Sequence, residues 1–181
     1  VGVLSNNAVL NYGEDGRVVE AVGDPMEVAL LVAGAKAGLK REPLLQDLPE
    51  AREVAFDPKV KMMATLHERE SDYCVAVKGS PESVLQVCTH VLTLDGRDAL
   101  DDAARERWLE QNDEMARQGL RVLALAQKTA QDVMEGEDAI ITSMRRFAND
   151  AKCVEYLKTF KDDTESKMVD YRKALVVKMQ H

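Results

Sequence analysis

The stretch from residue 56 to residue 81, FDPKVKMMATLHERESDYCVAVKGSP, places one aromatic side chain and two lysines around turns. A purine nucleotide needs an aromatic face for its base, cations for its phosphates, and backbone that can come close to it. Phe56 supplies an aromatic face at a strand end, Lys61 follows across a proline turn, and Lys78 precedes a glycine corner. The pattern favours a pocket for a flat, anionic ligand.

Each of these residues also has an ordinary structural interpretation. Phe56 is equally consistent with a place in the core, and Lys61 and Lys78 with solvated side chains. Lys78 stands directly before Gly79 and the start of a helix, where unpaired N–H groups and the helix dipole favour negative charge. The short motif KGSP is weak evidence by itself, so both interpretations stay open at this point.

Glu27 and Arg121, which lie outside this stretch, carry charges that suit the same ligand. Glu27 follows Asp24 by three residues, so it either completes a capping box at a helix start or accepts a hydrogen bond from the exocyclic amine of a base. Arg121 opens an apolar strand and can offer its guanidinium fork to a phosphate or to a neighbouring carboxylate.

Apolar periodicity predicts the elements that position these residues. Extended segments are expected at RVVEAVG, REVAF, MMATLHE, DYCVAVK, HVLTL and LRVLALAQK, and helices are expected over residues 25–37, after Ser80, and over 101–118. The helix over 25–37 is expected to bury the face with Met26, Leu30, Ala33 and Ala37. LRVLALAQK is apolar enough to occupy a central position in a sheet. These elements predict an α+β fold, with a twisted, mainly antiparallel sheet flanked by helices.

The character of the chain changes after residue 128. Apolar residues mark one helical stripe at Ile140 or Ile141, Met144, Phe147, Ala151, Val154 and Leu157, and a second at Met168, Tyr171 and Leu175. The polar segment KDDTES separates the stripes. A division into a domain of residues 1–128 and a helical segment of residues 129–181 is therefore expected.

Composition excludes several classes of function. The 181 residues carry a net charge of -8 and no compact basic run, which argues against nucleic-acid binding. Cys74, Cys88 and Cys153 form no CxxC pair, so neither a disulfide framework nor a zinc site is predicted, and the thiols are expected to be reduced in a cytosolic compartment. With no long apolar run and no signal-peptide pattern, the chain is expected to be soluble.

Common catalytic and phosphate-binding signatures are absent from the sequence. GxGxxG, GxxxxGK[ST], HExxH and GxSxG do not occur, so a nucleotide pocket here must be of another kind. His67 and His90 have no metal-ligand or triad spacing to a cysteine or an acid, and both are interpreted as structural. No catalytic residue and no metal ligand is predicted.

Four ordered motifs resemble a known family. GDPMEVALL, FDPKVKMM, VKGSPESVLQVCTHVL and GLRVLALA are similar, in order and spacing, to the nucleotide-binding domain of the P-type cation-transporting ATPases. The likeness is greatest to the calcium-pump and related bacterial branch, and it covers about residues 1–128. It implies the same α+β fold.

The resemblance implies a role for each candidate residue in binding ATP. Phe56 would stack on the adenine, Lys61 and Lys78 would line the ATP site, and Glu27 would reach the adenine amino group.

Further positions follow from the same motifs. Arg121 would contact phosphate, Leu123 would pack near the base, and Gly79 would let the ligand come close to the backbone. Many relatives have an arginine or another polar residue where this chain has Pro58, so the resemblance does not imply a phosphate contact at this position.

The resemblance also implies what this chain does not do. The DKTGT motif that carries the phosphorylated aspartate is missing, so ATP held here, with Mg²⁺ in the full pump, would serve an aspartate in a separate phosphorylation domain. Phosphorylation and actuator domains would be its partners, and the domain would lie on the cytoplasmic side of a membrane-embedded pump, without nucleic acid and without direct membrane contact. The alternative is a degenerate domain that docks a partner through its C-terminal helices.

Overall fold

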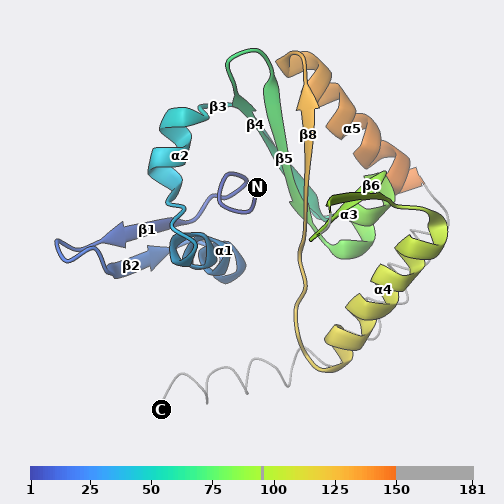
Figure 1. The fold of residues 1–181 in the computed structure, drawn as a ribbon, viewed down its shortest axis with the longest axis horizontal. Helices are drawn as coiled ribbons and strands as arrows, with labels where there is room; N and C mark the ends of the chain where they lie inside the picture. The colour runs from blue at the N-terminus through green and yellow to red at the C-terminus, as the bar shows by residue number, and fades with distance from the viewer. Residues whose placement is uncertain (95, 150–181) are drawn as a thin grey trace.

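A computed structural model describes residues 1–94 and 96–149 of the chain. The elements, in chain order, are β1 (Val9–Tyr12), β2 (Val18–Val22), α1 (Pro25–Lys36), α2 (Arg41–Asp47), β3 (Glu50–Asp57), β4 (Met62–Glu68), β5 (Tyr73–Gly79), α3 (Pro81–Val87), β6 (His90–Thr93), β7 (Gly96–Ala99), α4 (Asp102–Arg117), β8 (Ala124–Ala130) and α5 (Val133–Asn149). Strand pairs are antiparallel throughout, and helices flank the sheets (Figure 1). The predicted α+β class is confirmed.

The central sheet has the strand order β3-β4-β5-β8. The β1–β2 hairpin, α1 and α2 lie to one side of it, and α3, α4 and α5 lie to the other (Figure 1). The prediction that LRVLALAQK sits centrally is wrong, because β8 is an edge strand of this sheet and Leu125 is 45% exposed. Its alternate residues Ala124 and Ala126 pack against the core beneath α3 and α5, so the apolar run reflects one covered face.

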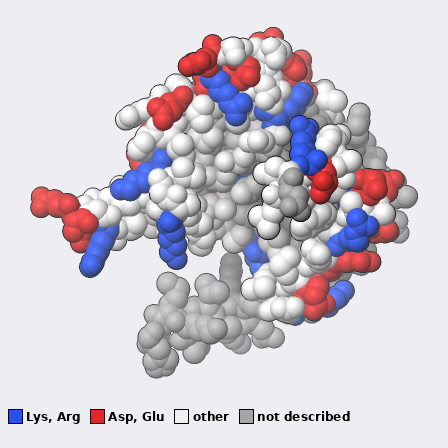
Figure 2. All heavy atoms as spheres, viewed as in Figure 1, with Lys and Arg blue, Asp and Glu red and all other residues white. Residues whose placement is uncertain are grey.

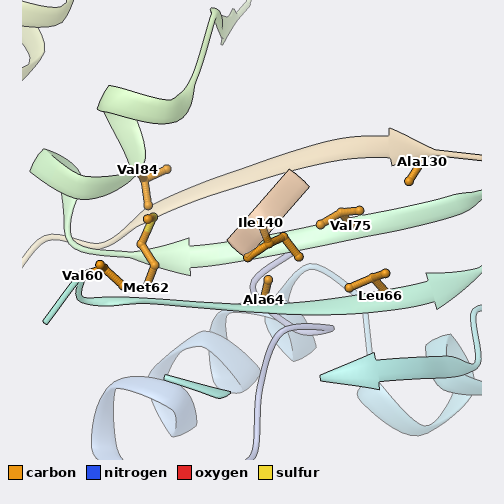
Figure 3. Packing of buried hydrophobic residues seen from close by; sticks show 8 residues of the cluster. All are labelled: Val60, Met62, Ala64, Leu66, Val75, Val84, Ala130 and Ile140. Carbon is orange, nitrogen blue, oxygen red and sulfur yellow. The ribbon is translucent and has the colours of Figure 1, made fainter. Parts of the chain in front are cut away.

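The main core lies between the sheet and helices α3 and α5 (Figure 3). Its buried residues are Val60, Met62, Ala64, Leu66, Val75, Val84, Ala130 and Ile140. Successive strand residues point to opposite faces, and Thr65, His67, Cys74 and Ala76 on the second face are buried as well. Both faces of the β4–β5 hairpin are therefore covered, which is why the alternation in YCVAV does not identify a single inward face.

Helix α1 starts and ends where the sequence predicts. The carboxylate of Asp24 accepts a hydrogen bond from the N–H of Met26 at 2.8 Å, and Gly38 follows the helix with φ of 80°. The predicted buried face is wrong, since Leu31 and Gly34 are the buried residues. A Cβ on Gly34 would lie 2.3 Å from the side chain of Val3, so the N-terminal segment, and not the sheet, selects this face.

Helix α5 lies across the sheet and brings Ile140 into the main core. It covers the beginning of the first predicted C-terminal stripe. The rest of that stripe, the second stripe and Cys153 lie outside the described residues. Within residues 1–94 and 96–149, no helix combines the length and the apolar character that crossing a membrane requires.

Candidate functional site

The predicted site residues gather at one end of the central sheet, where β3 and β5 end and β4 and β8 begin. Met62 pairs with Asp57 on one side and with Gly79 on the other, and Gly79 pairs with Ala124. Segments far apart in the sequence therefore meet at this end because of the antiparallel register.

Phe56 lies at the exposed edge of this region. Its exposed fraction is 56%, so the interpretation of Phe56 as a core residue is wrong. The register of β3 shifts between Val54 and Asp57, and Phe56 lies within this irregular stretch, directly before Asp57, the partner of Met62 on β4. The turn that follows is held by Asp57, whose side chain and carbonyl accept hydrogen bonds from the N–H groups of Lys59 and Lys61 at 2.8 and 2.7 Å.

Lys78 and Glu27 form an ion pair between β5 and α1. Their side chains are only 8% and 15% exposed, so the interpretation of Lys78 as a solvated lysine is wrong. A charge removed from water to this extent requires a partner, and the two residues, 51 positions apart, supply it to each other. The pair ties the first helix to the central hairpin.

The second carboxylate oxygen of Glu27 accepts a hydrogen bond from the N–H of Asn7 at 3.3 Å. The carboxylate is thus directed toward Asn7 and Lys78, and the capping-box interpretation of Glu27 is wrong. Asn7 also donates from its side chain to Glu53 on β3 at 3.2 Å. Asn7 and Glu53 were not predicted from the sequence; the polar triplet SNN between two apolar segments is the signal that marks Asn7.

Lys61 and Gly79 meet through the backbone. Lys61 adopts φ of 52°, and its carbonyl accepts a hydrogen bond from Ser80 N–H at 3.0 Å. A Cβ on Gly79 would lie 2.5 Å from that carbonyl oxygen, so the fold itself requires glycine here. The approach of a ligand to Gly79 stays a prediction. The Lys61 ammonium lies 3.4 Å from Glu82, a carboxylate in the first turn of α3 that sequence reasoning missed.

Arg121 and Leu123 precede β8 in an irregular segment. Leu123 is half-buried, and its neighbour Ala124 pairs with Gly79, so the segment enters the same end of the sheet. Arg121 is exposed, and among the described residues it forms no ion pair.

The charges at this end of the sheet nearly cancel, because Glu27 pairs with Lys78 and Glu82 with Lys61. On the face shown in Figure 2, acidic and basic side chains alternate around the rim and the middle is mostly uncharged. The arrangement offers an exposed ring and two carboxylate–ammonium pairs. It suits a base more than a cluster of phosphates.

A cavity of about 430 Å³ lies elsewhere, between the N-terminal segment, α1, α2 and the β5–β8 side of the sheet. Its lining is largely aliphatic, with Leu30, Leu44 and Leu125 among its residues, and it contains none of the predicted site residues. The candidate site is therefore a surface arrangement at the end of the sheet and not this cavity.

His67 lies toward the other end of β4 and is fully buried. Its Nδ1 donates to the carbonyl of Leu48 at 3.1 Å, because that oxygen can only accept, and its Nε2 accepts from the hydroxyl of Thr65 at 2.8 Å. Burial lowers the pKa of His67, against the opposing effect of the Leu48 carbonyl. These contacts agree with a structural role for His67.

Comparisons with known proteins identify the family. The family described as P-type ATPase, cytoplasmic domain N, matches residues 1–169, which extends beyond the part covered by the four motifs. The chain is 41% identical over 132 residues to the cation-transporting ATPase pma1 of Synechocystis, a match that covers 72% of this chain and 14% of that protein.

Two further relatives agree with this assignment. A probable cation-transporting ATPase F of Mycobacterium tuberculosis is 39% identical over 123 residues, covering 68% of this chain and 13% of the relative. Calcium-transporting ATPase 1 of Bacillus cereus is 35% identical over 126 residues, covering 70% of this chain and 14% of the relative. The chain thus spans about one seventh of the length of these relatives, and it belongs to the family of the cytoplasmic N domains of P-type cation-transporting ATPases.

Proposed function

We propose that this domain binds ATP at the end of the sheet formed by β3, β4, β5 and β8 and holds it for phosphoryl transfer to an aspartate in a separate domain. The observation that carries the proposal is the exposed ring of Phe56 at the same sheet end as the Glu27–Lys78 pair. Family membership supports it, since the matching relatives are named as cation-transporting ATPases.

The proposed binding mode is centred on the base. The adenine stacks on Phe56, its amino group donates to Glu27, and Leu123 packs beside the ring. Lys61 and Lys78 line the site, each beside its carboxylate partner, and Arg121 contacts phosphate; Mg²⁺ accompanies ATP in the full pump. The phosphates stay partly exposed, which allows a second domain to reach them. Catalysis of such a transfer consists mostly of positioning and charge neutralisation.

Replacement of Phe56 by alanine tests the proposal directly. Stacking of a base on an aromatic side chain contributes roughly 1–3 kcal/mol, so Phe56→Ala is expected to weaken ATP binding about tenfold or more. The dissociation constant is measured by calorimetry, or by the chemical shifts of backbone amides around Phe56 and Lys78 during ATP titration.

Trp108→Ala is a matched control, because Trp108 is also a partly exposed aromatic residue but lies on α4. It is expected to leave the dissociation constant unchanged. Equal affinity of the wild type and Phe56→Ala would contradict the proposed stacking. An absence of shifts in the wild type at millimolar ATP would instead favour the alternative, an interaction module that docks a partner through its C-terminal helices.

A further inference from the structure

Asn7 joins three parts of the fold at the proposed site. Its backbone N–H donates to the Glu27 carboxylate on α1 at 3.3 Å, and its side-chain amide donates to the Glu53 carboxylate on β3 at 3.2 Å. These partners are 20 and 46 residues away in the sequence. Asn7 lies between them in the segment that leads into β1.

Asn6 holds this segment in place. It is fully buried, its amide donates to the carbonyls of Gly2 and Glu27 at 3.1 and 3.0 Å, and its side-chain oxygen accepts from Ala8 N–H at 2.9 Å. A residue with so many of its polar groups satisfied has little freedom to move. The neighbouring Asn7 therefore has a fixed backbone from which its side chain reaches β3.

Glu53 precedes Phe56 by three residues on the same strand. β3 is an edge strand, paired on one side only, so its outer end is held by fewer contacts than β4 or β5. The Asn7–Glu53 hydrogen bond is a second attachment for this strand. This bond connects β3, the strand of Phe56, to Asn7, whose backbone N–H donates to Glu27.

We propose that Asn7 is a positioning residue that sets the Glu27 carboxylate relative to the ring of Phe56, and thereby the preference for adenine. The inference rests on the proposed ATP binding. One oxygen of Glu27 faces Lys78 and the other faces Asn7 N–H, and each carboxylate oxygen keeps a further acceptor site for the amino group of a base. The amino group reaches Glu27 only if the base stacked on Phe56 has the correct separation from it.

The test compares ATP with inosine triphosphate, which carries a carbonyl oxygen where adenine carries its amino group. The wild-type chain is expected to prefer ATP, because a carbonyl facing a carboxylate leaves both acceptors without a donor. Asn7→Ala keeps the backbone N–H that donates to Glu27 and removes the side-chain hydrogen bond to Glu53, which fixes the strand of Phe56 relative to Glu27. It is expected to weaken ATP binding about three- to tenfold, the range for one lost hydrogen bond, and to leave the affinity for inosine triphosphate nearly unchanged. Both affinities are measured by calorimetry on the full chain.

Asn11→Ala is the matched control. Asn11 donates from its side chain to Glu20 at 2.8 Å, so it forms the same kind of exposed Asn–Glu hydrogen bond, but within the β1–β2 hairpin. It is expected to keep the wild-type preference for ATP. Glu53→Ala removes the same hydrogen bond as Asn7→Ala while leaving Asn7 intact, and it is expected to reduce the preference for ATP to the same extent. It provides a second measurement of the effect if Asn7→Ala lowers the melting temperature of the chain.

The outcomes separate the two proposals. A wild type that binds neither nucleotide would overturn the proposed function itself. A wild type that prefers ATP, with Asn7→Ala and Glu53→Ala keeping that preference, would overturn only the role of Asn7. Loss of the preference in both variants, and not in Asn11→Ala, would support it.

Discussion

Gly79 illustrates a single residue whose type is set by the fold. It ends β5 opposite Met62, and a Cβ at this position would lie 2.5 Å from the Lys61 carbonyl oxygen and 3.1 Å from Met62 Cα. Both neighbours are backbone atoms, which cannot turn aside as a side chain can. Gly79→Ala is therefore expected to reduce the free energy of unfolding by about 1–3 kcal/mol, toward the upper end. Urea unfolding followed by circular dichroism measures the loss.

Gly13→Ala provides the comparison for that experiment. Its added Cβ would lie 3.0 and 3.2 Å from the exposed side chains of Val19 and Asp15, and the nearest backbone atom beyond its chain neighbours, the Arg17 carbonyl oxygen, is 3.9 Å away, at ordinary contact distance. Its effect is expected to stay within about 0.5 kcal/mol, as for other surface substitutions. Equal stability of the two variants would contradict the prediction, because it would show that the backbone around residue 79 accommodates a Cβ atom without a loss of free energy of unfolding.

His67 makes the stability of the fold depend on pH. Its pKa in the folded chain is lowered by burial from the ordinary value of 6.5, so the unfolded chain takes up a proton first as the pH falls. The free energy of unfolding is expected to decrease as the pH falls through about 6.5, and to be unaffected by His67 above it. Unfolding curves between pH 5 and pH 8 should show a steeper decrease for the wild type than for His67→Gln.

The exposed His90 serves as the control for this pH dependence. His90→Gln is expected to keep the wild-type slope, because the predicted slope comes from the buried His67 and this substitution leaves His67 and its contacts in place. If His67→Gln keeps the same slope as the wild type, then His67 is protonated equally in both states and its burial does not govern the acid response.

At the scale of elements, local signals predicted the type of most helices and strands but missed β1, α2 and β7, and they predicted tertiary placement poorly. The turn residues Asp24, Gly38 and Gly119 marked helix ends that the structure reproduces to within a residue or two. The face of α1 and the place of β8 were wrong, because both depend on which distant segment covers an apolar surface. Val3, Ala8 and Leu10 of the N-terminal segment cover the buried face of α1, and the helices α3 and α5 cover one face of β8.

A substitution in helix α5 tests the proposed division of the chain into residues 1–128 and residues 129–181. Ile140 is 7% exposed and belongs to the same core cluster as Leu66 and Val75. Ile140→Ala is therefore expected to lower the free energy of unfolding of the sheet by about 2–5 kcal/mol, the usual cost of emptying a core position. Chemical denaturation with a probe on the sheet measures this.

Met134→Ala is the control on the same helix, since Met134 is 65% exposed. It is expected to change the free energy of unfolding by no more than about 0.5 kcal/mol. If Ile140→Ala were equally silent, α5 would contribute nothing to the sheet, as expected for a separate segment after residue 128.

At the scale of the whole molecule, the sequence predicted which residues belong to the site, but not which of them contact one another. Phe56, Lys61, Lys78 and Glu27 were selected from their types and their motif positions, and the structure brings them to one end of the sheet. That the cations are already paired with carboxylates depends on contacts across dozens of residues, which periodicity does not encode. Asn7 was not predicted because its partners Glu27 and Glu53 are likewise distant in the sequence.

This pairing sets how the whole domain should respond to an anion. The chain carries a net charge of -8, and Lys78 and Lys61 each have a carboxylate partner, so the attraction for the ATP phosphates is small. Adenosine is therefore expected to bind within about tenfold of ATP, a difference of roughly 1.4 kcal/mol. For the same reason, the ATP affinity should change by less than about threefold between 50 and 300 mM salt, although the Debye screening length decreases from roughly 14 to 6 Å over this range.

Calorimetric titrations with adenosine and with ATP at both salt concentrations test the two expectations together. Binding of ATP without binding of adenosine, combined with a steep loss of affinity at high salt, would show that the phosphates hold the nucleotide and that the stacking of adenine on Phe56 is secondary.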